Sequence, residues 1–357
     1  MEHRNCVLKT LVACTLAAGA MTGANATIIS PSAYVPLISS GAFPDTPATR
    51  VDPNVSSSPY SGVVSINIRY DGLSYICSGA LVGKRSVVSA GHCVDTDGNG
   101  TLIDINKPGS DVRVIFNSSG TYNAIMTATK VSMNEDYKGF GNCPVGVPGF
   151  CLNDDVSVIT LGEDAPASAK IYKIAANPLL SGTHTYLAGY GTTGDGINGY
   201  TQGPAFNIKR TGENYVDLFD GDDEQNFGGA SEVWYADFDG GGRDTFCDFA
   251  GVCSPVLAND KETNIGGGDS GGPSFVWQYG ELMLAGNNTF GNSFLYDDGQ
   301  FGTYFGGMVL GSYKDYLQRA TGGDISLVPE PGTFALFGLG AVALLGARRR
   351  MSRPEMS

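Results

Sequence analysis

The segment Gly268-Asp269-Ser270-Gly271-Gly272-Pro273 carries more information about this chain than any other. A serine hydroxyl is a weak nucleophile at neutral pH, and it reacts only when a base takes its proton and N–H groups stabilise the oxyanion. The glycines let the backbone bend sharply and leave its amide groups uncovered by side chains. A glycine-rich surface turn would have the same composition, so the chain must also supply a base and a carboxylate.

Both of these groups lie upstream, in two further motifs. Residues 89–93 read Ser-Ala-Gly-His-Cys and contain His92, and residues 155–159 read Asp-Val-Ser-Val-Ile and begin with Asp155. The order His, Asp, Ser is that of chymotrypsin-type proteases. On these three motifs the chain resembles the trypsin/chymotrypsin family of serine endopeptidases. The resemblance implies that Ser270 attacks peptide bonds, with His92 as general base and Asp155 as its partner.

Few other residues compete for these roles. His3 lies in a leader segment, and His184 stands alone on a strand-like run, where a histidine is usually structural. Asp154 competes with Asp155 for the carboxylate role. The family pattern places one aliphatic, one small and two aliphatic residues after the aspartate, which fits Asp155 alone. We therefore expect Asp154 to be solvated.

Composition and periodicity predict an all-β fold. The chain has 357 residues, 51 of them glycine, and short aromatic or β-branched runs alternate with clusters of Gly, Asn, Asp and Ser. Nine runs read as strands: 63–69, 76–82, 86–89, 112–116, 156–161, 186–189, 275–278, 283–286 and 302–305.

The resemblance adds an architecture to these runs. It implies two packed six-stranded antiparallel barrels, at about 62–160 and 180–308, with the catalytic residues between them. Both barrels would belong to a protease domain at 51–321 that ends in a short helix at 312–319. The acidic, glycine-rich stretch 195–260 looks like an inserted loop.

The resemblance also places the groups that surround the nucleophile. The backbone N–H groups of Gly268 and Ser270 are expected to form the oxyanion hole. Asn264 is expected at the floor of the substrate pocket, where a neutral amide disfavours a strong preference for Arg or Lys. The other expected pocket residues are Thr289, Phe290, Gly291 and Gly302.

Activation by cleavage is a further expectation. Residues 27–50 are rich in Ser, Pro, Ala and Thr and are predicted to be a propeptide or linker. In the family, a cut frees an apolar N-terminal residue whose ammonium pairs with the aspartate beside the nucleophile. Arg50 and Val51 would flank that cut, and Val51 would pair with Asp269. Asp52-Pro53 stands where the family usually has glycines, which departs from the pattern.

The two ends of the chain read as targeting segments. Residues 1–26 have a basic start, an apolar stretch and Ala-Asn-Ala before position 27, as in a secretory signal. Residues 322–357 are predicted to be a linker and sorting tail: Val-Pro-Glu-Pro-Gly is followed by an apolar run at 334–347 and by three arginines at 348–350.

This tail resembles the PEP-CTERM sorting signal of Gram-negative bacteria. The resemblance implies export through the inner membrane, removal of the tail by an exosortase, and a final location at the cell surface or outside the cell. A plain membrane anchor is the alternative, although the apolar run is shorter than the roughly 20 residues that a spanning helix needs.

The cysteines fit an exported protein. Two of the eight precede residue 27, and six remain, an even number that suits an oxidising compartment. Cys77 and Cys93 match the family disulfide that closes the histidine loop. The other four are Cys143, Cys151, Cys247 and Cys253, which form two close pairs by sequence but leave the connectivity open.

The net charge of −14 disfavours nucleic acid and anionic membranes as partners. No cofactor is required for the expected reaction. The stretch that begins at Asp95 resembles the start of a calcium loop, in which Asp95, Asp97 and Asn99 would supply oxygen ligands. A turn-rich surface loop is the alternative. A weaker calcium candidate is Asp237 and Asp239 with Asp244.

Two functions from different classes remain open. The first is a secreted serine endopeptidase, whose partners would be a protein or peptide substrate, an activating protease and an exosortase. The second is a surface binding protein on the same fold without turnover. Such relatives usually lose a member of the triad, whereas His92, Asp155 and Ser270 are all present here.

Overall fold

The computed structural model describes residues 27–28, 38–118, 121–177, 179–292 and 295–329. These residues form two large β-sheets, one two-stranded sheet and two short α-helices, α2 (Thr245–Ala250) and α3 (Lys314–Ala320). Within this described part, no helix is long and apolar enough to cross a membrane. The predicted signal at 1–26 and the apolar run at 334–347 lie outside the described residues.

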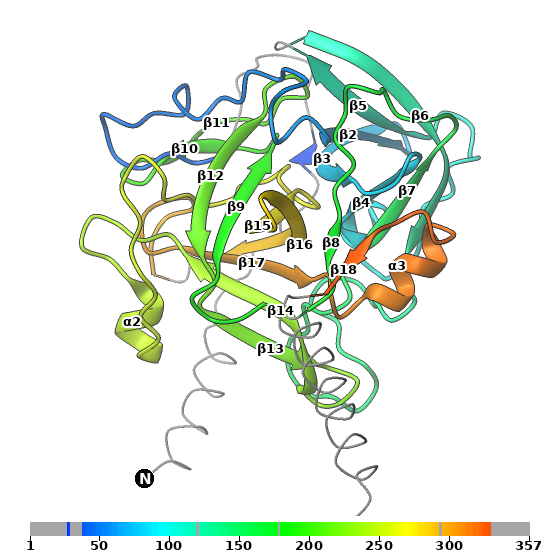
Figure 1. Ribbon diagram of the computed structural model, residues 1–357. Helices are drawn as coiled ribbons and strands as arrows, with labels where there is room; N and C mark the ends of the chain where they lie inside the picture. Colours follow the sequence, from blue (N-terminus) through cyan, green and yellow to red (C-terminus); the bar gives the residue numbers. More distant parts are fainter. Residues whose placement is uncertain (1–26, 29–37, 119–120, 178, 293–294, 330–357) are drawn as a thin grey trace, which may run out of the picture.

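The first sheet is a closed barrel of six antiparallel strands (Figure 1). Its strands are β2 (Val63–Tyr70), β3 (Leu73–Leu81), β4 (Ser86–Ser89), β5 (Asp111–Ser118), β6 (Thr121–Met133) and β7 (Ser157–Leu161). The order is β3-β2-β5-β6-β7-β4, and pairing of β3 with β4 closes the ring. A short strand, β1 (Thr27–Ile28), also pairs with β3. The predicted closed barrel is confirmed for this half.

Strand β2 shows how the apolar residues build this barrel. Successive side chains of a strand face opposite sides. Val64, Ile66 and Ile68 pack in the interior of the barrel, whereas Val63 packs in the cluster between the two sheets. Both faces of the strand are therefore buried at its start.

The second sheet is longer and less regular. Its main path runs β12-β9-β15-β16-β17-β14-β13. These strands are β9 (His184–Gly189), β12 (Arg210–Tyr215), β13 (Leu218–Asp222), β14 (Gly228–Asp237), β15 (Pro273–Gln278), β16 (Glu281–Asn292) and β17 (Tyr304–Val309). A short strand, β8 (Ile174–Ala175), pairs in parallel with β16. A second short strand, β18 (Leu327–Val328), pairs in parallel with β8.

The second barrel is only partly formed. No strand ladder joins β12 to β14 within the described residues, so the ring stays open at this place. A side chain bridges the gap instead, because Nδ2 of Asn214 donates hydrogen bonds to the carbonyl oxygens of Asp237 and Thr263, each at 2.8 Å. The predicted pair of six-stranded barrels is thus one closed barrel and one open, curved sheet.

All nine predicted strands coincide with strands of the structure, but the inserted loop predicted at 195–260 is wrong. This stretch contains β12, β13 and β14, and also β11 (Gly199–Gln202), which pairs with β10 (Thr193–Asp195). The buried face of β12 is Arg210, Gly212 and Asn214, so its alternation is not hydrophobic and escapes a search for apolar periodicity. The irregular parts are residues 203–209 and the longer segment between β14 and β15, which includes α2.

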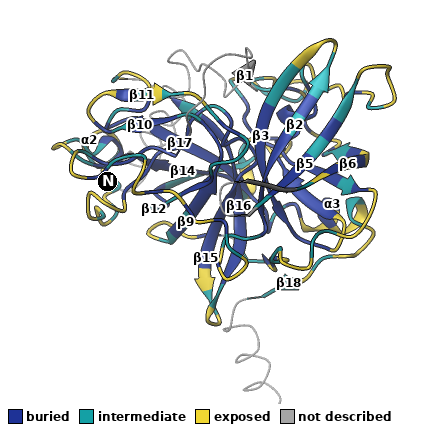
Figure 2. Ribbon diagram, turned by 90° about the horizontal axis from the view of Figure 1, so that it is seen from above, coloured by how far each residue is buried: buried dark blue, intermediate teal, exposed yellow. Residues whose placement is uncertain are grey.

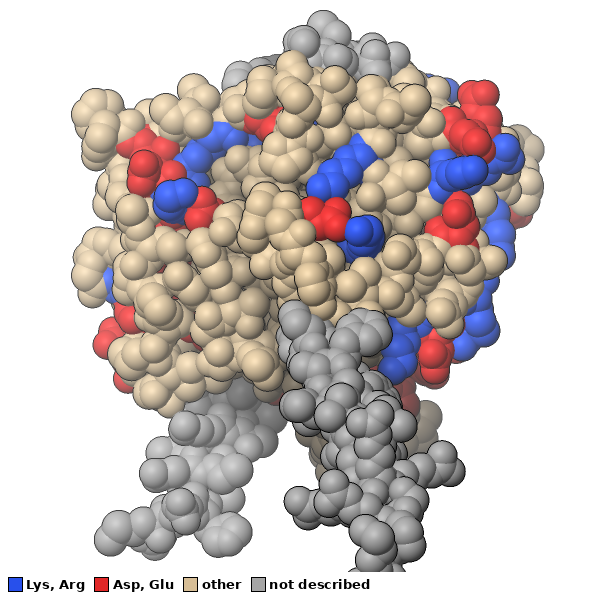
Figure 3. Space-filling view, viewed as in Figure 1, with Lys and Arg blue, Asp and Glu red and all other residues tan. Residues whose placement is uncertain are grey.

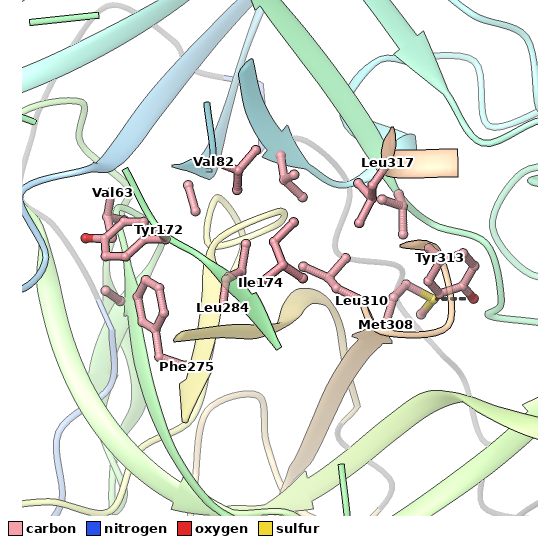
Figure 4. Close-up of a cluster of buried hydrophobic side chains, with 14 of the residues drawn as sticks. Val63, Val82, Tyr172, Ile174, Phe275, Leu284, Met308, Leu310, Tyr313 and Leu317 are labelled. Atoms are coloured by element: carbon pink, nitrogen blue, oxygen red, sulfur yellow. Dashed lines mark hydrogen bonds between the residues drawn. The ribbon is translucent and has the colours of Figure 1, made fainter. Parts of the chain in front are cut away.

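The two sheets share a hydrophobic core (Figure 4). Val63 lies in β2 and Val82 directly follows β3. Phe275 and Leu284 come from the second sheet, and Leu317 comes from the helix α3 predicted at 312–319. Figure 2 shows that the central parts of the strands are buried and that exposure is concentrated in loops and strand ends. The core therefore fixes the two halves against each other.

Part of the acidic character of the chain is internal. On the face in Figure 3, acidic and basic side chains are interspersed rather than gathered in one patch. Many carboxylates are instead buried in the second half of the chain: Asp217, Asp223, Glu232, Asp237, Asp239, Glu262 and Asp269.

Candidate active site

His92 and Asp155 form a hydrogen-bonded pair at the first barrel. His92 lies on a single 3₁₀ turn (Gly91–Cys93) directly after β4. Its Nδ1 is 2.7 Å from Oδ2 of Asp155, and its backbone N–H donates to Oδ1 at 2.7 Å. The carboxylate thus holds both the ring and the backbone of His92. A disulfide between Cys77 and Cys93 fixes the same turn to β3.

Polar side chains that the sequence did not single out support this pair. Nδ2 of Asn287 donates to the backbone carbonyls of Asp155, at 3.1 Å, and of Ser89, at 3.2 Å. The hydroxyl of Ser157 donates to the carbonyl of Ala90 at 2.6 Å. Asn287 comes from β16 of the second sheet, so its role depends on the packing of the two sheets and has no local sequence signal.

Asp154 is buried, and the prediction that it is solvated is wrong. Its backbone is in the left-handed region, with φ of 66°. Nδ2 of Asn134 donates to it at 2.8 Å, and its backbone N–H donates to the Tyr313 hydroxyl at 3.0 Å. Burial, together with nearby carboxylates such as Glu232, raises the pKa of Asp154 to about 9.

Ser270 lies where the loop before β15 meets the first barrel. Its backbone carbonyl accepts a hydrogen bond from the Ser78 N–H at 2.8 Å and lies 3.8 Å from Sγ of Cys93, the neighbour of His92. Ser270 is 1% exposed. The structure thus brings the loop of Ser270 to the turn that carries His92.

The backbone at Gly268 is held in a defined orientation. The carbonyl of Gly267 accepts hydrogen bonds from the N–H and the hydroxyl of Thr192, at 2.8 and 3.0 Å. Because C=O and N–H of one trans peptide point in opposite directions, the Gly268 N–H is directed away from Thr192. The Ser78 hydroxyl fixes the next peptide through the Gly268 carbonyl at 2.9 Å. Gly268 has φ of 101°, which favours glycine.

The residues expected at the substrate pocket are buried near one another. Nδ2 of Asn264 donates to Oγ1 of Thr303 at 2.7 Å, so its amide is already engaged. Gly302, with φ of 85°, lies against the ring of Tyr296, on which the Arg243 guanidinium stacks at 4.0 Å. A Cβ at Gly291 would meet only the carbonyl oxygens of Ile265 and Tyr304, each at 3.9 Å.

The other two expected wall residues, Thr289 and Phe290, lie in β16 at a bulge where the register with β17 shifts. Sequence reasoning did not single out Tyr296 or Arg243, which have no family motif around them.

The expected activation site is built into the fold in this uncleaved chain. Arg50 is 6% exposed, and its guanidinium pairs with Asp45 at 2.6 Å and donates to the Glu262 carbonyl at 2.9 Å. The Arg50 carbonyl accepts from the Thr211 N–H at 3.0 Å, and Val51 bridges to Arg210. Residues 50–52 therefore run along the edge of β12.

Asp269 is completely buried beside Ser270, the expected nucleophile. Its carboxylate accepts hydrogen bonds from the N–H groups of Gly191, at 2.7 Å, and Gly266, at 3.0 Å. Burial raises the pKa of Asp269 to about 7, against the opposing effect of these N–H groups and of the Arg210 charge. Among the interactions of the described residues, none joins Asp269 to Val51.

The remaining predicted residues lie apart from this centre. Disulfides join Cys143 to Cys151 and Cys247 to Cys253. His184 stacks on Tyr215 and pairs with Glu213 at 2.9 Å, which suits a structural role.

The predicted calcium loop already uses several of its oxygens for hydrogen bonds within the loop. The Asp95 carboxylate accepts from the N–H groups of Asn99 and Gly100, at 3.3 and 2.7 Å, and Oδ1 of Asn99 accepts from Thr101. Asp97 is exposed. The three residues of the weaker calcium candidate do lie close together. Asp237, Asp239 and Asp244 each have a carboxylate oxygen within 4.8 Å of the others.

The chain is similar to known proteins in two of its parts. Residues 50–207 match the family model described as Trypsin, and residues 327–350 match the model described as PEP-CTERM protein-sorting motif. Trypsin zeta of Drosophila erecta is 24% identical over 241 residues, which cover 62% of this chain and 69% of that protein. A solved structure titled as HL collagenase is 16% identical with a TM-score of 0.47, over 74% of this chain and 94% of that one.

The matched models confirm the predicted resemblance to the trypsin family and to PEP-CTERM tails. The match to the Trypsin model includes His92 and Asp155 and ends before Ser270.

Proposed function

We propose that this chain, which contains a trypsin-family protease domain and a PEP-CTERM sorting motif, is an exported serine endopeptidase. The observation that carries the proposal is the pair of hydrogen bonds from His92 to Asp155. With Nδ1 held by the carboxylate, the free basic nitrogen of the imidazole is Nε2, which has no hydrogen-bond partner among the described residues. That nitrogen is available to take a proton from Ser270.

In the proposed reaction, Ser270 Oγ bonds to the carbonyl carbon of a peptide while its proton passes to Nε2 of His92. Asp155 stabilises the imidazolium and keeps the ring oriented. The Gly268 and Ser270 N–H groups would hold the oxyanion. His92 then gives the proton to the leaving amine, the peptide C–N bond breaks, and an acyl-enzyme remains. A water molecule reverses the sequence, forming the carboxylic acid and restoring the Ser270 hydroxyl.

The substrate is proposed to be a peptide bond that does not follow Arg or Lys preferentially. Asn264 carries no charge, and its amide is bonded to Thr303. A pocket without an acidic floor gives a cationic side chain no partner after desolvation. A cleavage profile on a peptide library tests this, and a profile confined to Arg and Lys would refute it.

Activation between Arg50 and Val51 is part of the proposal. The freed Val51 ammonium would supply the positive charge that buried Asp269 lacks as a direct partner among the described residues. Replacing Arg50 by Gln should leave a precursor of low activity if the activating protease requires a basic residue. N-terminal sequencing of the active form is the direct check, and full activity with a start at Thr27 would contradict the mechanism.

The proposed location is the cell surface or the medium of a Gram-negative bacterium. The matched PEP-CTERM motif supports this location, with an exosortase as the processing partner. Intact-mass measurement of protein recovered from outside the cell should show that the apolar run at 334–347 has been removed. Recovery of the full C-terminus in a membrane fraction would favour a plain anchor.

One experiment separates the proposed protease from a binding protein on the same fold. A serine-directed organophosphonate labels only a serine that a neighbouring base activates. We expect one label on Ser270 in the wild type and none in the His92→Ala variant. A folded wild-type protein that takes no label, after N-terminal sequencing has shown the cut at Arg50, would refute the protease.

A further inference from the structure

Four carboxylates that the sequence analysis did not connect converge next to the catalytic pair. They are Asp154, Asp223, Glu224 and Glu232, and each has an oxygen within 4.8 Å of the others. Calcium binds oxygen ligands at about 2.3–2.6 Å, so oxygens on opposite sides of one ion are separated by about twice that distance. The observed spread is the one that a single calcium ion can span.

These residues come from both halves of the molecule. Asp154 lies in the loop between β6 and β7 of the closed barrel, and the other three lie at the β13–β14 hairpin of the second sheet. The two segments lie side by side, because Nδ2 of Asn153 donates to the Gly221 carbonyl at 2.8 Å (Figure 1). An ion at this place would therefore connect the two halves.

Asp223 gives an observation that is independent of the clustering. It is 2% exposed, and its Oδ1 has no hydrogen-bond partner among the described residues. A buried carboxylate oxygen without a partner is costly, because nothing replaces the water it has lost. Its other neighbours here are carboxylates, which offer repulsion instead of compensation. A cation is the group that would satisfy this oxygen.

Amide groups orient two of the other carboxylates. Nδ2 of Asn134 donates to Oδ1 of Asp154 at 2.8 Å, and Nδ2 of Asn153 donates to Oε2 of Glu232 at 2.9 Å. Such outer partners commonly fix the ligands of a metal ion and leave the second carboxylate oxygen for coordination. None of the four carboxylates has an ion pair with a basic residue in the described part of the chain.

The cluster opens onto a cavity of about 270 Å³. Asp154, Glu224 and Glu232 line it, together with Asp136, Asp222 and Asp315. The basic residue in the lining, Arg319, is paired with Glu135. The cavity therefore gives a cation an entrance of negative charge and space for water ligands. No histidine or cysteine belongs to the cluster, which favours a hard cation over zinc.

We propose that Asp154, Asp223, Glu224 and Glu232 bind a calcium ion that ties the β13–β14 hairpin to the loop carrying the catalytic Asp155. Asp154 directly precedes Asp155, so fixing Asp154 restrains the backbone from which Asp155 reaches His92. The site is separate from the Asp95 loop and from the Asp237, Asp239 and Asp244 group. The binding of calcium does not depend on the proposed protease activity.

The test uses the full chain with Ser270 replaced by Ala, so that autolysis contributes nothing. After treatment with EGTA, titration with CaCl₂ should show a site that is lost in Asp223→Asn and in Glu232→Gln. At about 100 times the dissociation constant, calcium should raise the melting temperature of the parent by roughly 5 °C. Terbium, which substitutes for calcium, should luminesce through the neighbouring Tyr313, and both variants should lose this signal.

Two matched controls locate the site. Asp315→Asn changes a carboxylate that lines the same cavity outside the four, and Asp239→Asn changes the separate acidic group. Both should keep the melting-temperature shift and the terbium signal. Loss of the shift in Asp239→Asn with retention in Asp223→Asn and Glu232→Gln would overturn the proposal, and so would a parent that binds no calcium. If the two variants fail to fold, anomalous scattering from terbium-soaked crystals of the parent decides, and a peak elsewhere refutes the site.

Discussion

The closed barrel and the open second sheet bury different kinds of residue. The barrel interior is aliphatic, with Val64, Ile66 and Val114 among its members. The second sheet buries Arg210 and Asn214 on β12, and several carboxylates are buried on β14 and in the chain that follows it. The interior of the first barrel is apolar, whereas the second sheet also depends on hydrogen bonds from buried polar side chains such as Asn214. The proposed nucleophile and the expected pocket belong to the second half, and the proposed base and its carboxylate belong to the first.

If both halves contribute to one active centre, removing a group from either should have the same large effect. Ser270→Ala and His92→Ala should each lower kcat by about 10⁶, and the double variant should be little worse. Activity assays with melting temperatures as the control for folding measure this. Substantial activity in Ser270→Ala would refute the shared centre.

The two adjacent aspartates should separate catalysis from the second-half contacts. Asp155→Asn should lower kcat by about 10⁴, because the amide favours the wrong tautomer of His92. Asp154→Asn should lower it less than about tenfold, and should mainly weaken the calcium-dependent stabilisation. Steady-state kinetics with and without EGTA distinguish the two, and the reverse order of effects would move the catalytic role to Asp154.

The stability of the second sheet at the gap between β12 and β14 should depend on the side-chain amide of Asn214. Asn214→Ala leaves the carbonyls of Asp237 and Thr263 without this donor and should cost roughly 1–3 kcal/mol of unfolding free energy. Ile66→Ala in the barrel should cost about 2–5 kcal/mol through a cavity. Denaturant unfolding gives both values.

Hydrogen exchange gives the sharper difference between these two variants. It should accelerate selectively in β12 and β14 for Asn214→Ala. Uniform acceleration in both halves would mean that the second sheet is not held locally by Asn214.

Specificity should respond to a charge in the second half. Asn264→Asp should raise kcat/KM for substrates with Arg or Lys before the cut by roughly tenfold, which corresponds to about 1.4 kcal/mol. Peptide substrates that differ only at this residue measure the ratio. An unchanged ratio would place the substrate side chain away from Asn264.

The last expected effect is a pH dependence of stability that originates in the second half. The pKa of Asp269 is raised to about 7 in the folded protein, above its ordinary value, because of burial. The folded state therefore keeps a proton that the unfolded state releases, so this group's contribution to stability should fall as pH rises from about 4 through about 7.

Melting temperatures of the uncleaved Ser270→Ala protein across this range should show the decline. Asp269→Asn should make the decline shallower, because other buried carboxylates with raised pKa values still contribute, and the exposed Asp97→Asn should not change it. A decline of the same size in Asp269→Asn would assign it to other groups.

The fold was predictable where hydrophobic periodicity coincides with burial. All nine predicted runs became strands, including those that flank His92 and Ser270. β12 escaped because its buried positions are polar or glycine, and β6 escaped because Thr and Ala dilute its alternation. The open second ring also has no sequence signal, since closure depends on whether two distant strands meet.

Parts of the candidate site were predictable for a different reason. The motifs around His92, Asp155 and Ser270 are local, whereas Asn287, Thr192 and Ser78 act across sequence distances that only the fold determines. The acidic residues around Asp154 are separated in the same way, and their convergence follows from the contact of two loops. Asp154 was expected to be solvated because the sequence gives no sign of the hairpin that covers it.

The buried ion pair of Arg50 makes cleavage at this position a question of local unfolding. A protease that recognises Arg50 needs its side chain, which is 6% exposed and held by Asp45 and by the carbonyl of Glu262. If the precursor is activated at this bond, cutting requires that this edge has detached. The activation rate is then the cutting rate multiplied by the detached fraction when reclosing is fast. Asp45 would then set how long the precursor survives in the presence of its activator.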